Sequence, residues 1–307
     1  MRYSPLAANA EVQFFEYDDA WLCTSKSSMG LKGHAIVHDF ALTRKHYIVH
    51  QAPSTLNSLA LSLGLQPSMS CIGYDTSKTG TFHIKTRDGG ESRTVAAPGS
   101  GFLFQIANSF EDKESGAIVI DAIEMPCLPI GAPPATGSWK ETFDFARDVP
   151  RAQLVRYSIP ADAAPVQRTV MDEAFQAFPE VNPYVKTVAH SFVYTSGGGG
   201  GGGDAAPLQT VRKFDVRQGL VVGEYRVGAS EFVSGPTFVP RPEGCSEDDG
   251  YLLVTVLDGA AAEGGGAATR LEILDALDLN KGPLCSVALN TYLSHTLYGY
   301  VSLSCTR

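Results

Sequence analysis

Charged residues are scarce in this 307-residue chain, and no apolar run is long enough to cross a membrane. Lys, Arg, Asp and Glu make up 19% of the residues, and the net charge at pH 7 is −9. A general nucleic-acid binder needs a basic surface, so this composition argues against that function. The best apolar stretches, Ser58–Leu65 and Tyr251–Leu257, have the length of a strand, whereas a membrane-spanning helix needs roughly 20 residues.

The cysteine motifs of metal sites and disulfide scaffolds are also missing. The six cysteines lie at least 20 residues apart, and no Cys-x-x-Cys occurs. This spacing argues against a zinc ribbon and a dense disulfide framework, and it favours a reducing compartment. The N-terminal residues lack the basic start and apolar core of a signal peptide. We therefore expect a soluble intracellular protein without a transmembrane segment.

Short β-rich runs with a period of two recur along almost the whole chain. Turn residues predict hairpins at Arg87–Gly90 and Lys113–Gly116. Weak helical periodicity predicts helices at Ser54–Leu65 and Val170–Ala177. The predicted strands are Val12–Tyr17, Ile36–Leu42, Tyr47–His50, Thr81–Lys85, Ser92–Ala96, Phe102–Ala107, Ala117–Ile123, Glu141–Phe145, Gln153–Ile159, Ser191–Thr195, Leu208–Phe214, Gly219–Val227, Thr237–Val239, Tyr251–Leu257, Arg270–Leu274, Leu284–Leu289 and Leu297–Leu303.

This pattern predicts an all-β fold that is part of a larger β-propeller. A propeller blade has four strands, so about sixteen strands correspond to about four blades. The blade sequences show no clear repeat that would close four blades into a ring. Seven glycines, Gly197–Gly203, are followed by Asp204–Ala206. We expect residues 197–206 to form a flexible loop insertion between strands, because no phosphate-binding motif follows the glycines.

Four of the seven histidines fall within 17 residues, at His34, His38, His46 and His50. Even spacing on a strand places side chains on one face, so His34 would share a face with His38, and His46 with His50. A metal site and ordinary histidines of a hairpin are both compatible with this spacing.

Other chemical motifs are weak. The acidic run Glu247-Asp248-Asp249 precedes Gly250 and predicts a solvated turn. No Gly-x-Ser-x-Gly nucleophile motif occurs, so the sequence gives no support to a serine nucleophile at a strand–helix elbow.

Seven sequence blocks carry a more specific signal. They resemble, in order and spacing, the signature blocks of the carotenoid cleavage oxygenase family. The likeness is good over roughly Val12–Glu124 and Gly235–Val301 and thin between Pro126 and Val227. The blocks are His38–Thr43 (HDFALT), Cys71–Lys78 (CIGYDTSK), Phe102–Asp112 (FLFQIANSFED), Ala177–Pro183 (AFPEVNP), Gly235–Asp258 (GPTFVPRPEGCSEDDGYLLVTVLD), Arg270–Leu279 (RLEILDALDL) and Leu297–Val301 (LYGYV).

The resemblance implies a seven-bladed β-propeller, of which residues 1–307 would be the C-terminal portion, about the last four blades. It also implies a ferrous ion on the propeller axis, held by four histidines, and cleavage of an alkene in a carotenoid, apocarotenoid or stilbene by dioxygen. Neutral imidazoles suit Fe(II), and open coordination positions allow dioxygen to bind beside an apolar polyene. A plastid location and peripheral contact with a membrane are compatible with such a member.

Carried over residue by residue, the ligand set is degenerate in this chain. His38 matches one histidine ligand. The next ligand position holds Gln105 and the last holds Tyr298, unless a register slip of three brings His295 there. The family's first ligand lies upstream of the matched blocks. We therefore expect this chain to bind Fe(II) weakly or not at all.

The residues that would orient the ligand imidazoles are also altered. Ala177 and Gly235 stand where the family has glutamates, and such changes typically cost about 10–100-fold in metal affinity or activity. Two hypotheses follow: an iron-dependent dioxygenase represented by an incomplete chain, or a non-enzymatic relative that binds an apolar ligand or has decayed. A propeller for protein interaction is a third class. An upstream segment with a further histidine would favour the first.

Overall fold

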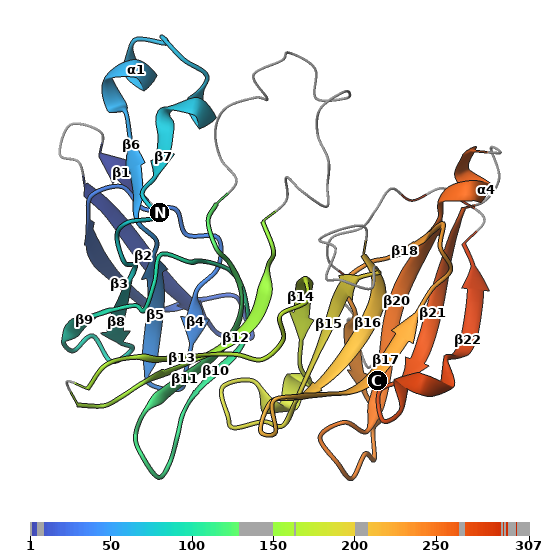
Figure 1. Cartoon of the computed structure of the whole chain (residues 1–307). Coiled ribbons are helices and arrows are strands. Elements are labelled where there is room, and N and C mark those ends of the chain that lie inside the picture. Colours follow the sequence, from blue (N-terminus) through green and yellow to red (C-terminus); the bar gives the residue numbers. More distant parts are fainter. Residues whose placement is uncertain are drawn as a thin grey trace.

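Antiparallel sheets that follow one another in chain order build most of the molecule (Figure 1). The computed structural model describes residues 2–4, 9–128, 150–162, 164–199, 208–263, 268–289, 291, 293 and 299. Strands dominate and helices are few, so the all-β prediction is confirmed. The predicted strand Glu141–Phe145 lies outside the described residues, as does Leu297–Leu303 apart from Gly299.

Helices are short and peripheral. They are α1 (Ser58–Ser62), α4 (Gly259–Glu263) and the 3-10 turns η1 (Ser68–Cys71), η2 (Pro183–Val185) and η3 (Leu279–Lys281). In the described part of the chain, none is long and apolar enough to cross a membrane. The helix predicted at Ser54–Leu65 is correct only in its centre. There the Asn57 side chain accepts a hydrogen bond from the Ala60 N–H and begins α1.

The helix predicted at Val170–Ala177 is wrong. One strand ends at Val170 and the next begins at Gln176. Between them the Asp172 carboxylate accepts hydrogen bonds from the Ala174 N–H at 3.1 Å and from the Gln176 side chain at 2.8 Å. Side-chain bonds of this kind compete with helical backbone bonds and stabilise a turn.

The first sheet contains two strands that the sequence pattern did not predict, β1 (Arg2–Ser4) and β3 (Cys23–Lys32). Its members, in order, are β1, β2 (Asn9–Tyr17) and β3. Only Met29 and Leu31 are buried in β3, so an apolar alternation marks only its end. β3 forms because it pairs with β2, where Val12 lies opposite Met29.

The second sheet contains the first recognised block. Its members are β4 (Ala41–Leu42), β5 (His46–Gln51), β8 (Thr81–Thr86) and β9 (Ser92–Ala96), while β6 (Ser54–Leu56) and β7 (Ile72–Tyr74) form a separate pair. The hairpin predicted at Arg87–Gly90 is confirmed. The strand predicted at Ile36–Leu42 is wrong before Ala41. There the Asp39 carboxylate accepts hydrogen bonds from the N–H groups of Phe40 and Ile106, each at 2.8 Å, in place of a strand ladder.

The third and fourth sheets each have four consecutive strands. The hairpin predicted at Lys113–Gly116 joins the first two and is confirmed. Gly197 and Gly198 belong to a strand, so the loop predicted at 197–206 does not begin at 197; residues 200–207 lie outside the described part. The strands are β10 (Phe102–Glu111), β11 (Ile118–Met125), β12 (Gln153–Ile159) and β13 (Gln167–Val170), then β14 (Gln176–Glu180), β15 (Phe192–Gly198), β16 (Leu208–Asp215) and β17 (Leu220–Arg226).

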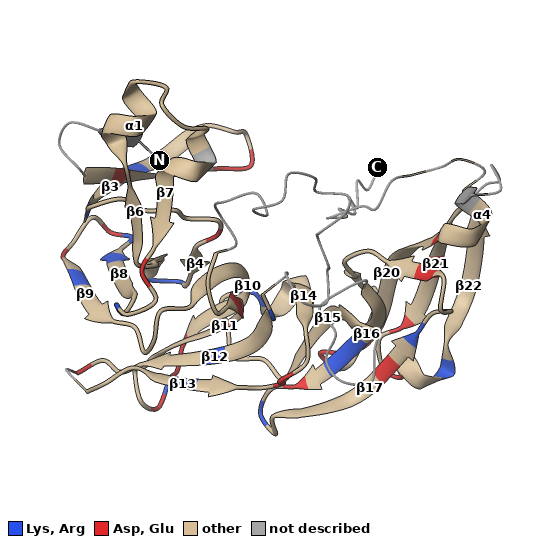
Figure 2. Ribbon diagram, turned by 45° about the horizontal axis from the view of Figure 1, so that its top comes forward, with Lys and Arg blue, Asp and Glu red and all other residues tan. Residues whose placement is uncertain are grey.

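The fifth sheet is built around its long central strand, which pairs with three others. Its members are β18 (Glu231–Val233), β19 (Thr237–Pro240), β20 (Gly250–Asp258), β21 (Thr269–Asp275) and β22 (Pro283–Ala288). Basic and acidic residues occur in the same sheets (Figure 2), and Arg212 of β16 forms an ion pair with Glu224 of β17 at 2.8 Å.

The hydrophobic cores lie between neighbouring sheets. One core joins the first and second sheets through residues such as Phe14 and Val49, and another joins the second and third sheets through Phe82 and Ile120. A third runs through the last three sheets. Because each sheet buries its faces against its neighbours, the sheets form one connected row, and loops at their edges can meet to form a site.

Candidate functional site

The blocks His38–Thr43 and Phe102–Asp112 are joined side by side. The Asp39 carboxylate accepts a hydrogen bond from the Ile106 N–H at 2.8 Å, and the Ser109 hydroxyl donates one to the Leu42 carbonyl at 2.9 Å. The Thr43 hydroxyl donates a bond to the Glu111 carboxylate. Polar residues of two blocks 60 or more residues apart in the chain therefore fix the position of β4 against β10.

A second set of bonds joins β10 to β14 and to the segment that follows β14. The Gln105 side-chain oxygen accepts a hydrogen bond from the Phe178 N–H at 2.9 Å, and the Asn108 side-chain oxygen accepts one from the Thr187 N–H, also at 2.9 Å. Phe178 and Thr187 have φ angles of +53° and +65°, which bulky and β-branched residues rarely adopt. Two amide side chains of one strand thus hold two strained turns.

These turns border a cavity of about 190 Å³, which we call the central cavity. It is lined by Ile106 and Ala107 of β10, Phe178–Glu180 of β14, Lys186, Gly235–Pro236 and Gly299. Apart from Lys186, each of these segments contains or adjoins a position that the resemblance singles out: Gln105, Ala177, Gly235 and Tyr298. The blocks therefore converge in space, as a shared site requires.

Burial changes the pKa of Glu180, the one acidic residue among the described residues that line the central cavity. Burial raises the pKa of Glu180 to about 7, although the nearby charge of Lys186 works in the opposite direction. The acid was not singled out from the sequence. The available signal was its place in the Ala177–Pro183 block, where the family's pattern has an arginine.

His38 lies in the loop between β3 and β4, not on a strand as the spacing argument assumed. Its side chain is exposed, and its ring packs on Phe104 of β10 with centroids 4.1 Å apart. Phe104, the residue that His38 contacts, directly precedes Gln105 on β10. Tyr298 and His295 lie outside the described residues.

The other clustered histidines do not come together as a metal site. His34 lies in a loop, so the shared face predicted with His38 does not exist. His46 and His50 are both on β5, but the His46 Nδ1 lies 3.0 Å from the Glu111 carboxylate, whereas His50 is buried beside Phe82. In the described ranges, no three His, Cys, Asp or Glu side chains are placed to hold a metal ion.

The described residues do not fit the iron centre that the resemblance implies. His38 supplies one imidazole, and the Gln105 oxygen is already engaged by the Phe178 N–H. Ala177 is buried without any ligand atom in its side chain, and Gly235 has no side chain to orient an imidazole. We therefore derive no chemical step through iron from these residues.

We expect Gln105→Ala to lower the free energy of unfolding by about 1–2 kcal/mol, because it removes a buried hydrogen bond that holds a strained turn. Gln153→Ala, which removes an exposed bond to Glu173 of 2.8 Å, is the matched control and should cost less. Urea unfolding at pH 7 measures both. Equal losses in the two variants would contradict the role assigned to Gln105.

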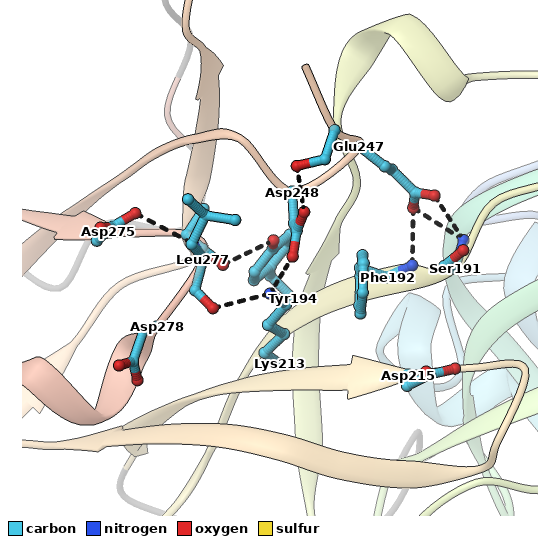
Figure 3. Close-up of polar contacts among 12 residues, drawn as sticks. Ser191, Phe192, Tyr194, Lys213, Asp215, Glu247, Asp248, Asp275, Leu277 and Asp278 are labelled. Atoms are coloured by element: carbon cyan, nitrogen blue, oxygen red, sulfur yellow. Dashed lines mark hydrogen bonds and ion pairs between the residues drawn. The ribbon is translucent and has the colours of Figure 1, made fainter. Parts of the chain in front are cut away.

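The acidic turn Glu247–Asp249 joins two sheets and is not simply solvated, as the sequence had suggested (Figure 3). The Glu247 carboxylate accepts hydrogen bonds from the N–H groups of Ser191 and Phe192 at 2.7–2.9 Å. The Asp248 carboxylate accepts one from the buried Lys213 ammonium at 2.7 Å. This block therefore stabilises the contact between the fourth and fifth sheets.

Comparison with known proteins shows which family the chain belongs to. Residues 1–301 match the family model described as retinal pigment epithelial membrane protein. The chain is 32% identical over 268 residues to apocarotenoid-15,15'-oxygenase of Synechocystis sp., covering 87% of this chain and 52% of that protein. It is 29% identical over 276 residues to isoeugenol monooxygenase of Pseudomonas putida, covering 86% and 54%.

Solved structures agree with the sequence comparison. The cobalt-substituted Synechocystis apocarotenoid oxygenase superposes with a TM-score of 0.85 at 28% identity, over 94% of this chain and 58% of that one. The chain thus spans about half the length of the curated relatives it matches. These matches confirm the resemblance found in the sequence blocks.

Proposed function

Because the chain belongs to the retinal pigment epithelial membrane protein family, we propose that its framework serves the reaction of the family's oxygenases. That reaction is oxidative cleavage of an alkene double bond in a carotenoid-like, apolar substrate by dioxygen, with Fe(II) as the cofactor. The observation that supports it is the convergence of four of the seven recognised blocks on one cavity, together with 32% identity to an apocarotenoid oxygenase.

The proposal also covers the architecture of the whole protein and its compartment in the cell. We propose that residues 1–307 form the C-terminal portion, about four blades, of a seven-bladed β-propeller. The succession of antiparallel sheets in chain order supports a propeller portion, although these residues build five such sheets and not four. This chain's own residues would position the substrate and exclude water with the apolar walls of the central cavity. The compartment stays a prediction: intracellular, with a plastid or a membrane surface as alternatives.

A second candidate function is binding of an apolar ligand without cleavage. The engagement of Gln105 by the Phe178 N–H favours it, because a residue at a ligand position then has a structural role. On this account the chain as it stands binds a polyene and forms no product. The framework is still that of an oxygenase, so restored histidines should restore chemistry.

An aldehyde-product assay on a panel of carotenoids and apocarotenoids separates these accounts. We expect no product from the natural chain loaded with Fe(II). The double variant Gln105→His, Tyr298→His should form aldehyde, and adding His38→Ala should abolish it. Gln105→Ala controls for loss of the Phe178 contact. A double variant that retains iron but forms no aldehyde would overturn the proposed reaction and leave the binding function.

A further inference from the structure

Two residues with charged side chains line the central cavity beside apolar ones. Glu180 lies at the end of β14, and Lys186 follows the 3-10 turn η2. Ile106, Phe178 and Pro236 supply apolar surface. Among the described lining residues, which come from β10, β14, the η2 segment, Gly235–Pro236 and Gly299, these two carry the only charges.

The backbone that presents both side chains is strained and held in place. Phe178 and Thr187 account for two of the three non-glycine residues with positive φ in the described part of the chain. The β14 ladder shifts register between Ala177 and Glu180. Strained turns persist only where their surroundings enforce them, and they cluster at ligand sites. Here β10 enforces both turns, with Gln105 and Asn108 as the acceptors.

Asn108 makes the second turn rigid. Its side-chain amide nitrogen donates to the Val185 carbonyl at 2.9 Å and to the Val188 carbonyl at 3.1 Å, and it lies 3.0 Å from the His190 ring nitrogen. One buried side chain therefore fixes the backbone on both sides of Lys186. The position of the lysine at the cavity does not depend on a bound ligand.

The two groups are complementary to a carboxylate. Lys186 is exposed and offers a cation at the mouth of the cavity. Because burial raises the pKa of Glu180 to about 7, a large share of its carboxyl groups carry a proton near neutral pH and can donate a hydrogen bond. Hydrogen bonds that involve a charged partner are roughly twice as strong as neutral ones.

We propose that the central cavity binds the carboxylate head of a small aromatic or polyene acid, which pairs with the Lys186 ammonium and accepts a hydrogen bond from the Glu180 carboxyl. The cavity volume of about 190 Å³ suits a group the size of benzoate, with its ring against the apolar walls. Binding needs neither iron nor turnover, so it succeeds or fails independently of the cleavage reaction.

Calorimetric titration of the full chain, without iron, with benzoate and with its neutral isostere benzamide tests this site. At pH 6 we expect benzoate to bind about tenfold more tightly than benzamide, as one charge-assisted interaction provides. The preference should decline as the pH rises through about 7, because Glu180 ionises and then repels the ligand. Equal affinities for the two compounds at pH 6, or no binding of either, would overturn the proposal.

Variants separate the two contacts. Lys186→Met should abolish the preference for benzoate, while Lys281→Met, on an exposed lysine paired with Asp278, should leave it unchanged. Glu180→Gln keeps a neutral donor, so it should bind at pH 6 and lose the pH dependence. Glu180→Ala should weaken binding about tenfold. An unchanged pH profile in Glu180→Gln, or unchanged selectivity in Lys186→Met, would contradict the site even if Glu180→Ala fails to fold.

Discussion

Asp121→Ala should lower the free energy of unfolding by about 3–5 kcal/mol at pH 7, because it leaves buried positive charge without its partner. Asp121 on β11 is fully buried and receives two hydrogen bonds of 2.7 Å from Arg156 of β12. The His190 Nε2 lies 2.9 Å from the same carboxylate, and Arg156 also donates to the Val216 carbonyl. The carboxylate therefore ties the third sheet to the fourth.

Urea unfolding followed by circular dichroism measures this loss. Burial acts to raise the pKa of Asp121, but the hydrogen bonds from Arg156 and His190 outweigh it and hold the pKa below the usual value. The carboxylate is thus ionised at pH 7, where the comparison is made. Asp162→Ala, on an exposed loop, should stay within about 0.5 kcal/mol of the natural chain. A loss below about 1 kcal/mol in Asp121→Ala would show that the network is dispensable.

Acid should destabilise the fold through His50. Burial, together with the charge of His83, lowers the pKa of His50 from 6.5 to about 3. The unfolded chain therefore takes up a proton at a higher pH than the folded chain. The stabilising contribution is fully present above about pH 6.5 and is lost as the pH falls toward 3. At about 1.4 kcal/mol for each unit of pKa difference, this loss reaches up to about 5 kcal/mol.

His50→Phe removes this dependence, because a phenyl ring next to Phe82 does not titrate. The measurement is the free energy of unfolding between pH 7 and pH 4 for the natural chain and the variant. Other buried groups contribute equally to both curves, so their difference isolates His50. The exposed His38→Phe should follow the natural chain. Parallel curves for the natural chain and His50→Phe would contradict the assignment.

The strands that the sequence predicted are those whose apolar residues alternate because one face packs on a neighbouring sheet. In β8, Phe82 and Ile84 are fully buried, and the strand was predicted almost to its ends. β3 was missed because its stability comes from pairing with β2, which a single-sequence pattern does not contain. The helix predicted at Val170–Ala177 does not form, because the Gln176 side chain donates a hydrogen bond to the Asp172 carboxylate and stabilises a turn there.

The sequence located the site's neighbourhood but not its contacts. The sequence blocks singled out Gln105, Ala177 and Gly235, and residues at or next to these positions line the central cavity. The blocks could indicate this because their spacing reflects the order of the sheets. The bond from the Phe178 N–H to Gln105 and the approach of Glu180 to the cavity depend on backbone turns with positive φ. No pattern of residue types encodes such turns for a phenylalanine or a threonine.

Iron content after anaerobic loading with Fe(II) and desalting tests the central claim, an oxygenase framework whose ligand set has been lost in this chain. The natural chain should retain far less than one equivalent. Gln105→His, Tyr298→His, which raises the number of histidines at ligand positions from one to three, should retain clearly more iron than the natural chain, and adding His38→Ala should lower that iron again. Near-stoichiometric iron in the natural chain, or no gain in the double variant, would contradict the claim.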